Sequence, residues 1–296
     1  MSSGRINLFK GCFTAIVTPF NNDSVDFIAL EKILDKQIQG DISGIVVCGT
    51  TGEAATMNEE ERLEVIRFVR EKVKDRPVIA GTGSNNTNEV LRFSKKVEAL
   101  GVDALLIVTP YYNKPNQKGL FEHYSYLEKN LDTPIILYNV PSRTGTSLSL
   151  ETITRLSSLE NIKGIKQAEV DFSKNIELCL LSCEDFCVLS GDDITAMALT
   201  ECGGDGVVSV VSNIIPQQLT NMIKYSLEGN SEKAKEILHT YQRLIDMMFI
   251  EVNPQPVKTL SAVLNGYEAV FRLPLTNMEE KNKEKLFGHA SSLGLI

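Results

Sequence analysis

Short apolar, β-branched runs recur along the first 210 residues, and segments with helical periodicity separate them. The runs predict eight strands, at residues 13–18, 44–48, 77–81, 103–109, 134–139, 162–166, 186–190 and 205–210. Nearly continuous apolar runs of this length are typical of parallel strands that are buried on both faces. The alternation of strand and helix therefore predicts an α/β fold with a parallel sheet.

Capping signals mark several of the intervening helices. Asp26 precedes an apolar stripe at helical spacing, formed by Leu30, Ile33, Leu34 and Ile38. Asn58 with Glu61 three residues later predicts a capping box. Gly101 is expected to end the helix before it, since glycine is favoured just beyond a helix C-terminus.

Eight strand–helix units in series favour a (β/α)8 TIM barrel, because right-handed crossovers build a parallel sheet that eight strands can close. The competing fold is an open, doubly wound sheet. That fold commonly carries a glycine-rich dinucleotide turn after its first strand, whereas the first predicted strand here leads into Thr18, Pro19 and Phe20. The sequence therefore predicts the barrel.

The pattern changes to helix alone after about residue 225. Gly229 and Asn230 interrupt the chain, and a long amphipathic stripe follows, which Pro254 and Pro256 are expected to end. We predict a catalytic barrel at residues 1–228 and an appended C-terminal helical region at residues 229–296. This region is expected to cover the barrel or to mediate assembly.

Composition and charge narrow the function classes. The chain has 296 residues and a net charge of −8, with no basic block, which argues against nucleic-acid binding. It has no run approaching the ~18 apolar residues of a membrane helix. Residues 1–8 contain no apolar segment of a secretory signal, so we expect a cytoplasmic protein. An anionic substrate would need a local cationic site.

Three of the six cysteines have a spacing that suggests a metal site. However, Cys179 and Cys183 are expected on one helix and Cys187 at the start of the next strand. The histidines lie far away in the sequence. Buried, reduced thiols are therefore the favoured interpretation.

Candidate chemistry lies at the predicted C-terminal ends of the strands, where such barrels place their reacting groups. Tyr138 and Lys166 end neighbouring strands. Either residue alone more often just reaches solvent, so the pair matters only if the fold makes the two converge. A buried lysine can attack a ketone to form an imine, and a nearby phenol can move the protons, aided by the hydroxyls of Thr50 and Tyr112.

Two further elements suit carboxylate substrates. The backbone amides and hydroxyls of Thr50 and Thr51, between two glycines, can cradle a carboxylate, although a simple capped turn is the alternative. Arg143 offers a planar guanidinium to a second carboxylate, although an arginine considered alone more often pairs with a surface acid. Asp192 and Asp193 are interpreted as a helix N-cap and not as a carboxylate pair.

Several ordered motifs resemble the signatures of the pyruvate-dependent Schiff-base lyases. They are Gly-Thr-Thr-Gly-Glu at 49–53, Tyr-Asn-Val-Pro-Ser-Arg-Thr at 138–144, Gly-Ile-Lys at 164–166 and Ser-Gly-Asp-Asp at 190–193. Segments 253–258 and 272–276 match the same family near the C-terminus. The motifs are most similar to the members that join pyruvate to L-aspartate 4-semialdehyde.

The resemblance implies a catalytic set. Lys166 would form the imine with pyruvate, and Tyr138 would donate and accept protons. Thr50 would link Tyr138 to Tyr112, which in this family reaches in from the neighbouring subunit. The product would be 4-hydroxy-tetrahydrodipicolinate, in the diaminopimelate route to L-lysine.

The resemblance also implies a binding set and an assembly. Thr51 and the backbone of Val208 would hold pyruvate, and Arg143 would bind the carboxylate of the semialdehyde. No metal or organic cofactor is implied beyond the covalent pyruvate imine. The family is usually a homotetramer, built as a dimer of dimers.

Two alternatives remain open. A sister enzyme on the same scaffold, such as an N-acetylneuraminate lyase or a keto-deoxy sugar acid aldolase, would use the same lysine and tyrosine. Thr50, where neuraminate lyases usually have serine, and Arg143 in its Pro-Ser-Arg-Thr context favour the synthase. A catalytically silent barrel that binds a keto acid is the other alternative, and the complete proton relay argues against it.

Overall fold

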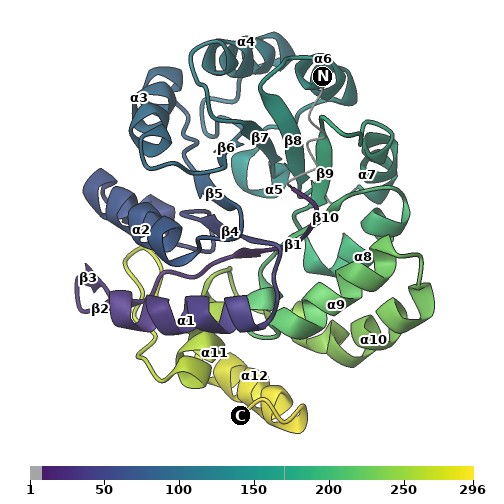
Figure 1. The fold of residues 1–296 in the computed structure, drawn as a ribbon. Helices are drawn as coiled ribbons and strands as arrows, with labels where there is room; N and C mark the ends of the chain where they lie inside the picture. Colours follow the sequence, from purple (N-terminus) through teal and green to yellow (C-terminus); the bar gives the residue numbers. More distant parts are fainter. Residues whose placement is uncertain (1–8, 170) are drawn as a thin grey trace.

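Eight parallel strands close into one barrel, as the sequence predicts (Figure 1). We describe the protein from a computed structural model that covers residues 9–169 and 171–296. The neighbours around the ring follow the order β1-β10-β9-β8-β7-β6-β5-β4. The barrel strands are β1 (Gly11–Ala15), β4 (Gly44–Val47), β5 (Val78–Gly81), β6 (Ala104–Val108), β7 (Ile135–Asn139), β8 (Ile162–Gln167), β9 (Cys187–Ser190) and β10 (Gly206–Ser209).

Seven predicted strands agree with the structure to within one residue at each end, and the first strand is present but its predicted bounds are wrong. Residues 13–18 were expected, but β1 begins at Gly11 and ends at Ala15. Gly11 pairs with Gly206, whose φ is +141° and where a Cβ would lie 2.0 Å from the Gly11 carbonyl oxygen. This close backbone approach requires glycine. Beyond β1 the chain enters a short hairpin, β2 (Phe20–Asn21) and β3 (Ser24–Val25), too short to predict from periodicity.

Helices surround the barrel, and their starts follow the capping signals. Asp26 accepts a hydrogen bond from the Ala29 amide, and Asn58 with Glu61 forms the predicted capping box. Gly101 adopts φ +72° just beyond a helix that ends at Glu98. The surrounding helices are α1 (Phe27–Gln39), α2 (Glu59–Lys72), α3 (Thr87–Glu98), α4 (Gln117–Glu128), α6 (Leu150–Ser157), α7 (Phe172–Cys179), α8 (Asp193–Glu201) and α9 (Pro216–Leu227); short turns form η1 (Ala54–Thr56), α5 (Pro141–Thr144) and η2 (Val211–Asn213).

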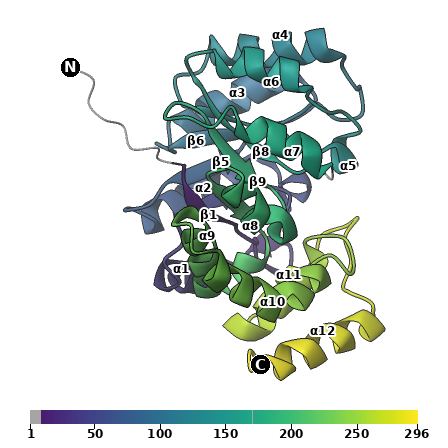
Figure 2. The same ribbon diagram turned by 90° about the vertical axis from the view of Figure 1, so that its right-hand side faces the viewer.

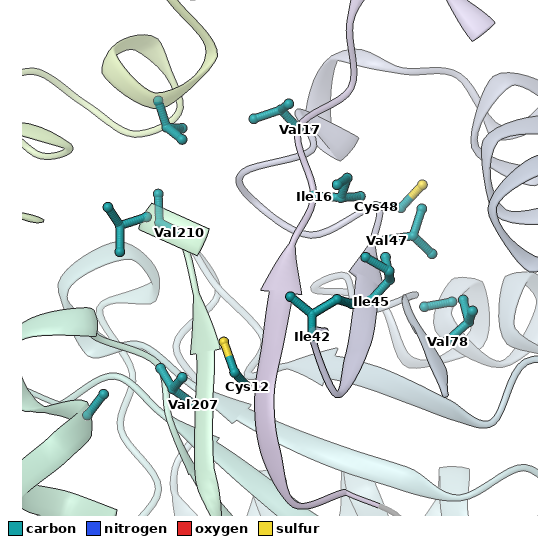
Figure 3. Close-up of a cluster of buried hydrophobic side chains, with 14 of the residues drawn as sticks. Cys12, Ile16, Val17, Ile42, Ile45, Val47, Cys48, Val78, Val207 and Val210 are labelled. Atoms are coloured by element: carbon teal, nitrogen blue, oxygen red, sulfur yellow. The ribbon is translucent and has the colours of Figure 1, made fainter. Parts of the chain in front are cut away.

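The strands separate two apolar layers. Alternate side chains point into the barrel, such as Val46, while their neighbours Ile45 and Val47 join the larger layer beneath the helices. Figure 3 shows part of this outer layer, where side chains from neighbouring strands gather around Ile45 and Val207. Because both faces are covered, the strands read as nearly continuous apolar runs.

Three further helices follow the barrel: α10 (Ser231–Met247), α11 (Gln255–Asn265) and α12 (Glu280–Ser292). They lie together on one side of the molecule, where α10 packs on α8 and α9, and α11 contacts α1 (Figure 2). The prediction that Pro254 and Pro256 end the long helix is wrong. The helix ends at Met247, and Pro256 lies in the first turn of α11, where a missing amide hydrogen costs nothing. We propose the division into residues 1–228 and 229–296 because the alternation of strand and helix stops there.

The cysteine prediction is correct only in part. Cys187 begins β9 and four thiols are buried, but α7 ends at Cys179, so Cys183 is not on that helix. Cys183 and Cys202 are exposed. Within the described ranges, no three His, Cys, Asp or Glu side chains form a group that could hold a metal ion.

The prediction about a secretory signal concerns residues 1–8, which lie outside the described residues. None of the helices in the described part of the chain is both long enough and apolar enough to cross a membrane.

His123 is the buried histidine of α4. Its side chain is 6% exposed, its Nδ1 lies 2.9 Å from the Thr87 hydroxyl, and its ring packs edge-on against Tyr124. Burial penalises the charged imidazolium and lowers the pKa of His123 from 6.5 to about 4. The unfolded chain therefore binds this proton more strongly, and stability is lost as the pH falls from 6.5 towards 4.

We expect His123→Gln to reduce the acid sensitivity of folding. Between about pH 7 and about pH 4.5, the wild type should lose about 2–3 kcal/mol more unfolding free energy than this variant. Urea unfolding at the two pH values measures the difference. His239→Gln, at an exposed histidine, is the matched control and should behave like the wild type. Equal acid sensitivity in all three proteins would contradict the prediction.

Candidate active site

Tyr138 and Lys166 lie side by side on neighbouring strands. They are direct partners in the parallel register of β7 and β8, and each is the second-to-last residue of its strand. The Lys166 Nζ lies 4.3 Å from the centre of the Tyr138 ring. Both side chains are buried, with 6% and 7% exposure. The fold therefore makes the predicted pair converge.

Gly191 leaves room for the lysine. A Cβ at this position would lie 3.1 Å from the Lys166 Cε and 2.8 Å from the Ala168 Cβ. Gly191 follows β9, the next strand around the ring, so the glycine of the Ser-Gly-Asp-Asp motif lies beside the end of the Lys166 side chain. A side chain there would crowd Lys166.

A cavity of about 580 Å³ opens beside Tyr138, and Lys166, Thr51 and Val208 are not among the residues that line it. Its walls include Tyr138 from β7, Thr50 from the loop after β4, Arg143 from α5 and Asn253 from the segment before α11. The barrel rim and the C-terminal region therefore both contribute walls. A cavity of this size accommodates two small substrates.

The loop at residues 49–53 is held on several sides. The Gly52 carbonyl oxygen accepts a hydrogen bond from the Thr18 hydroxyl at 2.8 Å. The Thr51 hydroxyl accepts one from the Asn253 side-chain amide at 3.0 Å, and the Glu53 amide donates to the Thr50 carbonyl oxygen at 3.1 Å. Thr51 is buried, whereas Thr50 is partly open to the cavity.

Arg143 also lines the cavity. It belongs to the short helix α5, and its Nη2 donates to the backbone carbonyl oxygen of Asn253 at 3.2 Å. The rest of its guanidinium remains open enough to meet an anionic group in the cavity. Asn253 therefore contacts both Thr51 and Arg143, and sequence reasoning gave it no role.

Arg62, on α2, lines the same cavity. Its guanidinium stacks on the Phe93 ring at 4.0 Å and donates to the Gly81 carbonyl oxygen at 2.8 Å. Burial lowers the pKa of Arg62. This cation lies on the β5 side of the cavity, away from Lys166 on β8.

Asp193 shapes the end of β10. Its Oδ2 accepts hydrogen bonds from the Val210 and Val211 amides, each at 2.9 Å, just beyond Val208. Burial raises the pKa of Asp193 to about 6. Asp192 caps α8 as predicted, accepting from the Ile194 amide. Asp193 instead ties the start of α8 to the loop after β10, which the prediction of a simple cap missed.

Tyr112 lies apart from the other predicted residues. Its side chain is 90% exposed, and its backbone adopts φ +70°, in the left-handed region that aromatic residues rarely enter. Tyr111, its neighbour, lines the cavity. One chain alone therefore does not bring Tyr112 to Lys166.

Comparisons with known proteins agree with this geometry. The sequence model of the dihydrodipicolinate synthetase family matches residues 8–292. The 4-hydroxy-tetrahydrodipicolinate synthase of Alkaliphilus oremlandii is 45% identical over 290 residues, which cover 98% of this chain and 100% of that protein. Dihydrodipicolinate synthases of known structure superpose closely. The protein from Aquifex aeolicus gives a TM-score of 0.94 at 39% identity, with 97% of this chain and 99% of that chain covered. The protein from Thermotoga maritima gives a TM-score of 0.95 at 39% identity, with 98% of this chain and 100% of that chain covered. The chain belongs to the dihydrodipicolinate synthetase family.

Proposed function

We propose that the protein condenses pyruvate with L-aspartate 4-semialdehyde, as a lyase that forms 4-hydroxy-tetrahydrodipicolinate for lysine biosynthesis. The observation that carries this proposal is the Lys166 amine, 4.3 Å from the Tyr138 ring centre and buried at the rim of the barrel. The family membership and the cation at Arg143 support the choice of substrates.

The first half-reaction joins pyruvate to Lys166. The amine attacks the ketone carbon, and the loss of water gives a protonated imine. The imine withdraws electrons, so a methyl proton of pyruvate is released and an enamine forms. Tyr138 is the group that moves these protons, and Thr50 lies on the same cavity wall to extend the relay. Thr51 and the Val208 backbone hold the pyruvate carboxylate.

The second half-reaction uses the enamine as a carbon nucleophile. Its terminal carbon attacks the aldehyde carbon of the semialdehyde, whose carboxylate Arg143 binds. The amine of the second substrate then attacks the imine carbon and displaces Lys166, so the ring closes and the enzyme is regenerated. The imine is itself the electron sink, so the proposed chemistry needs no added cofactor.

We propose that Tyr112 acts in the site of a neighbouring subunit. A bulky residue in the left-handed region is strained, and such strain concentrates at functional positions. An exposed, strained phenol next to the cavity-lining Tyr111 suits an interface that completes the site. We therefore propose a homodimer as the smallest active unit, two of which form a tetramer, in the cytoplasm.

Lys166→Ala should abolish covalent capture of pyruvate. Removing the amine removes the covalent route, so the rate should fall by several orders of magnitude. Borohydride reduction with pyruvate, followed by peptide mass mapping, measures the adduct. Lys163→Ala, on the same strand and paired with Asp185 at the surface, is the matched control and should keep the adduct. An adduct that persists in Lys166→Ala would refute the proposal.

Arg143→Ala should separate the two substrates. We expect pyruvate to be trapped normally, while binding of the semialdehyde weakens by roughly 2–4 kcal/mol through loss of a charge-assisted contact. Measuring KM for pyruvate and KM for the semialdehyde in the variant and the wild type separates the two effects. Arg155→Ala removes a guanidinium that stacks on Phe121 and should change neither value. An equal loss of pyruvate capture in Arg143→Ala would assign the residue to the first substrate or to folding.

Hybrid dimers should test the role of Tyr112. Tyr112→Phe and Lys166→Ala subunits should each be nearly inactive alone. When the two are co-expressed, one site of each hybrid receives both intact groups, so about a quarter of wild-type activity should return. Activity no higher than the sum of the parents would place Tyr112 in its own chain's site. Tyr126→Phe, at another exposed tyrosine, should be active alone.

A further inference from the structure

Glu53 and Lys258 form an ion pair in the interior of the protein. The Lys258 Nζ lies 2.5 Å from the Glu53 Oε1, and neither side chain is exposed to solvent. The partners are 205 residues apart in the sequence. Glu53 ends the Gly-Thr-Thr-Gly-Glu loop, and Lys258 belongs to α11 in the C-terminal region.

Two aromatic rings lie beside the amine of Lys258. The Lys258 Nζ lies 4.1 Å from the centre of the Phe20 ring and 5.0 Å from that of Phe271. The second carboxylate oxygen of Glu53, Oε2, is buried without a hydrogen-bond partner among the described residues. Burial lowers the pKa of Lys258 and raises that of Glu53, and each charge opposes the shift of the other. Such a pair is weak evidence for stability, because desolvation offsets much of the attraction.

The pair acts on a loop with a strained backbone. Glu53 adopts φ +53°, and Cys48, just before the loop, has the same value. Residues other than glycine persist in this conformation only where the surrounding structure holds them. The Glu53 amide donates to the Thr50 carbonyl oxygen, so the position of Glu53 and that of Thr50 are coupled. Asn253, five residues before Lys258, holds the Thr51 hydroxyl.

We propose that Lys258 is a positioning residue for pyruvate: by holding Glu53, it keeps Thr50 and Thr51 in the geometry that the keto acid requires. This inference rests on the proposed function, since it takes these two threonines as groups that serve the pyruvate site. Through this contact, the C-terminal helical region would help to shape the pyruvate site. Helix α11 lies against α1 and η2, where it can reach the loop from outside the barrel (Figure 1).

The test compares pyruvate binding with thermal stability. Lys258→Met and Glu53→Gln each leave one buried group without its partner, so both the melting temperature and the affinity for pyruvate should fall. The double variant removes both charges and should regain stability, because uncharged side chains of similar volume often replace a buried pair without loss. Its KM for pyruvate should nevertheless stay raised about tenfold or more, since the loop is no longer held.

Arg70→Met is the matched control. It breaks the Arg70–Asp103 ion pair beside the N-terminal ends of β5 and β6, at the end of the barrel opposite to the site. Its melting temperature should fall without a change in KM. A double Glu53→Gln, Lys258→Met variant with wild-type melting temperature and wild-type KM would overturn the inference.

A second variant covers the case in which the double variant does not fold. Glu53→Asp keeps both charges but shortens the reach of the carboxylate, so KM for pyruvate should rise; an unchanged KM would overturn the inference. Wild-type protein that fails to capture pyruvate would defeat the proposed function itself. If the wild type captures pyruvate and the variants keep the wild-type KM for pyruvate, only the proposed role of Lys258 is refuted.

Discussion

Closure of eight parallel strands into one ring is the constraint on which the site depends. Parallel pairing points every strand the same way, so all C-terminal ends meet at one rim. The register of β7 against β8 then places Tyr138 beside Lys166, although the two residues are not neighbours in the sequence. Gly191, after the next strand, leaves the lysine its space. Chemistry that needs an amine and a phenol within a few ångströms is thereby placed on rigid elements.

Hydrogen bonds fix two of the loops at the rim in place. The segment at residues 49–53 contacts Thr18 on one side and Asn253 on another, while the segment after β10 is tied to Asp193. Each of these bonds uses a buried polar group, and such groups are costly unless they find partners. The same contacts that satisfy the polar groups therefore fix the backbone around the cavity. One network of hydrogen bonds therefore both satisfies these polar groups and fixes the backbone at the rim.

The C-terminal region is joined to this network and does not merely cover the barrel. Asn253 contacts both Thr51 and Arg143, so one residue connects the loop after β4 with the short helix α5. The ion pair between Glu53 and Lys258 adds a second connection a few residues away. Arg272 extends the link through Glu61 on α2, with bonds of 2.6 and 2.8 Å. The chain after residue 229 thus contacts the loops at the rim.

The sequence by itself determined the barrel, seven of its eight strands, the helix caps at Asp26 and Asn58, and the strand-end placement of Tyr138 and Lys166. These features follow from local patterns of apolar spacing and capping, which a chain carries within about ten residues. Only the tertiary structure decided where β1 begins, since that depends on Gly11 meeting Gly206. It alone revealed that Asp193 holds the β10 loop, and that Asn253 and Lys258 reach residues more than 200 positions away. Contacts between distant segments form when the chain packs, so no local periodicity records them.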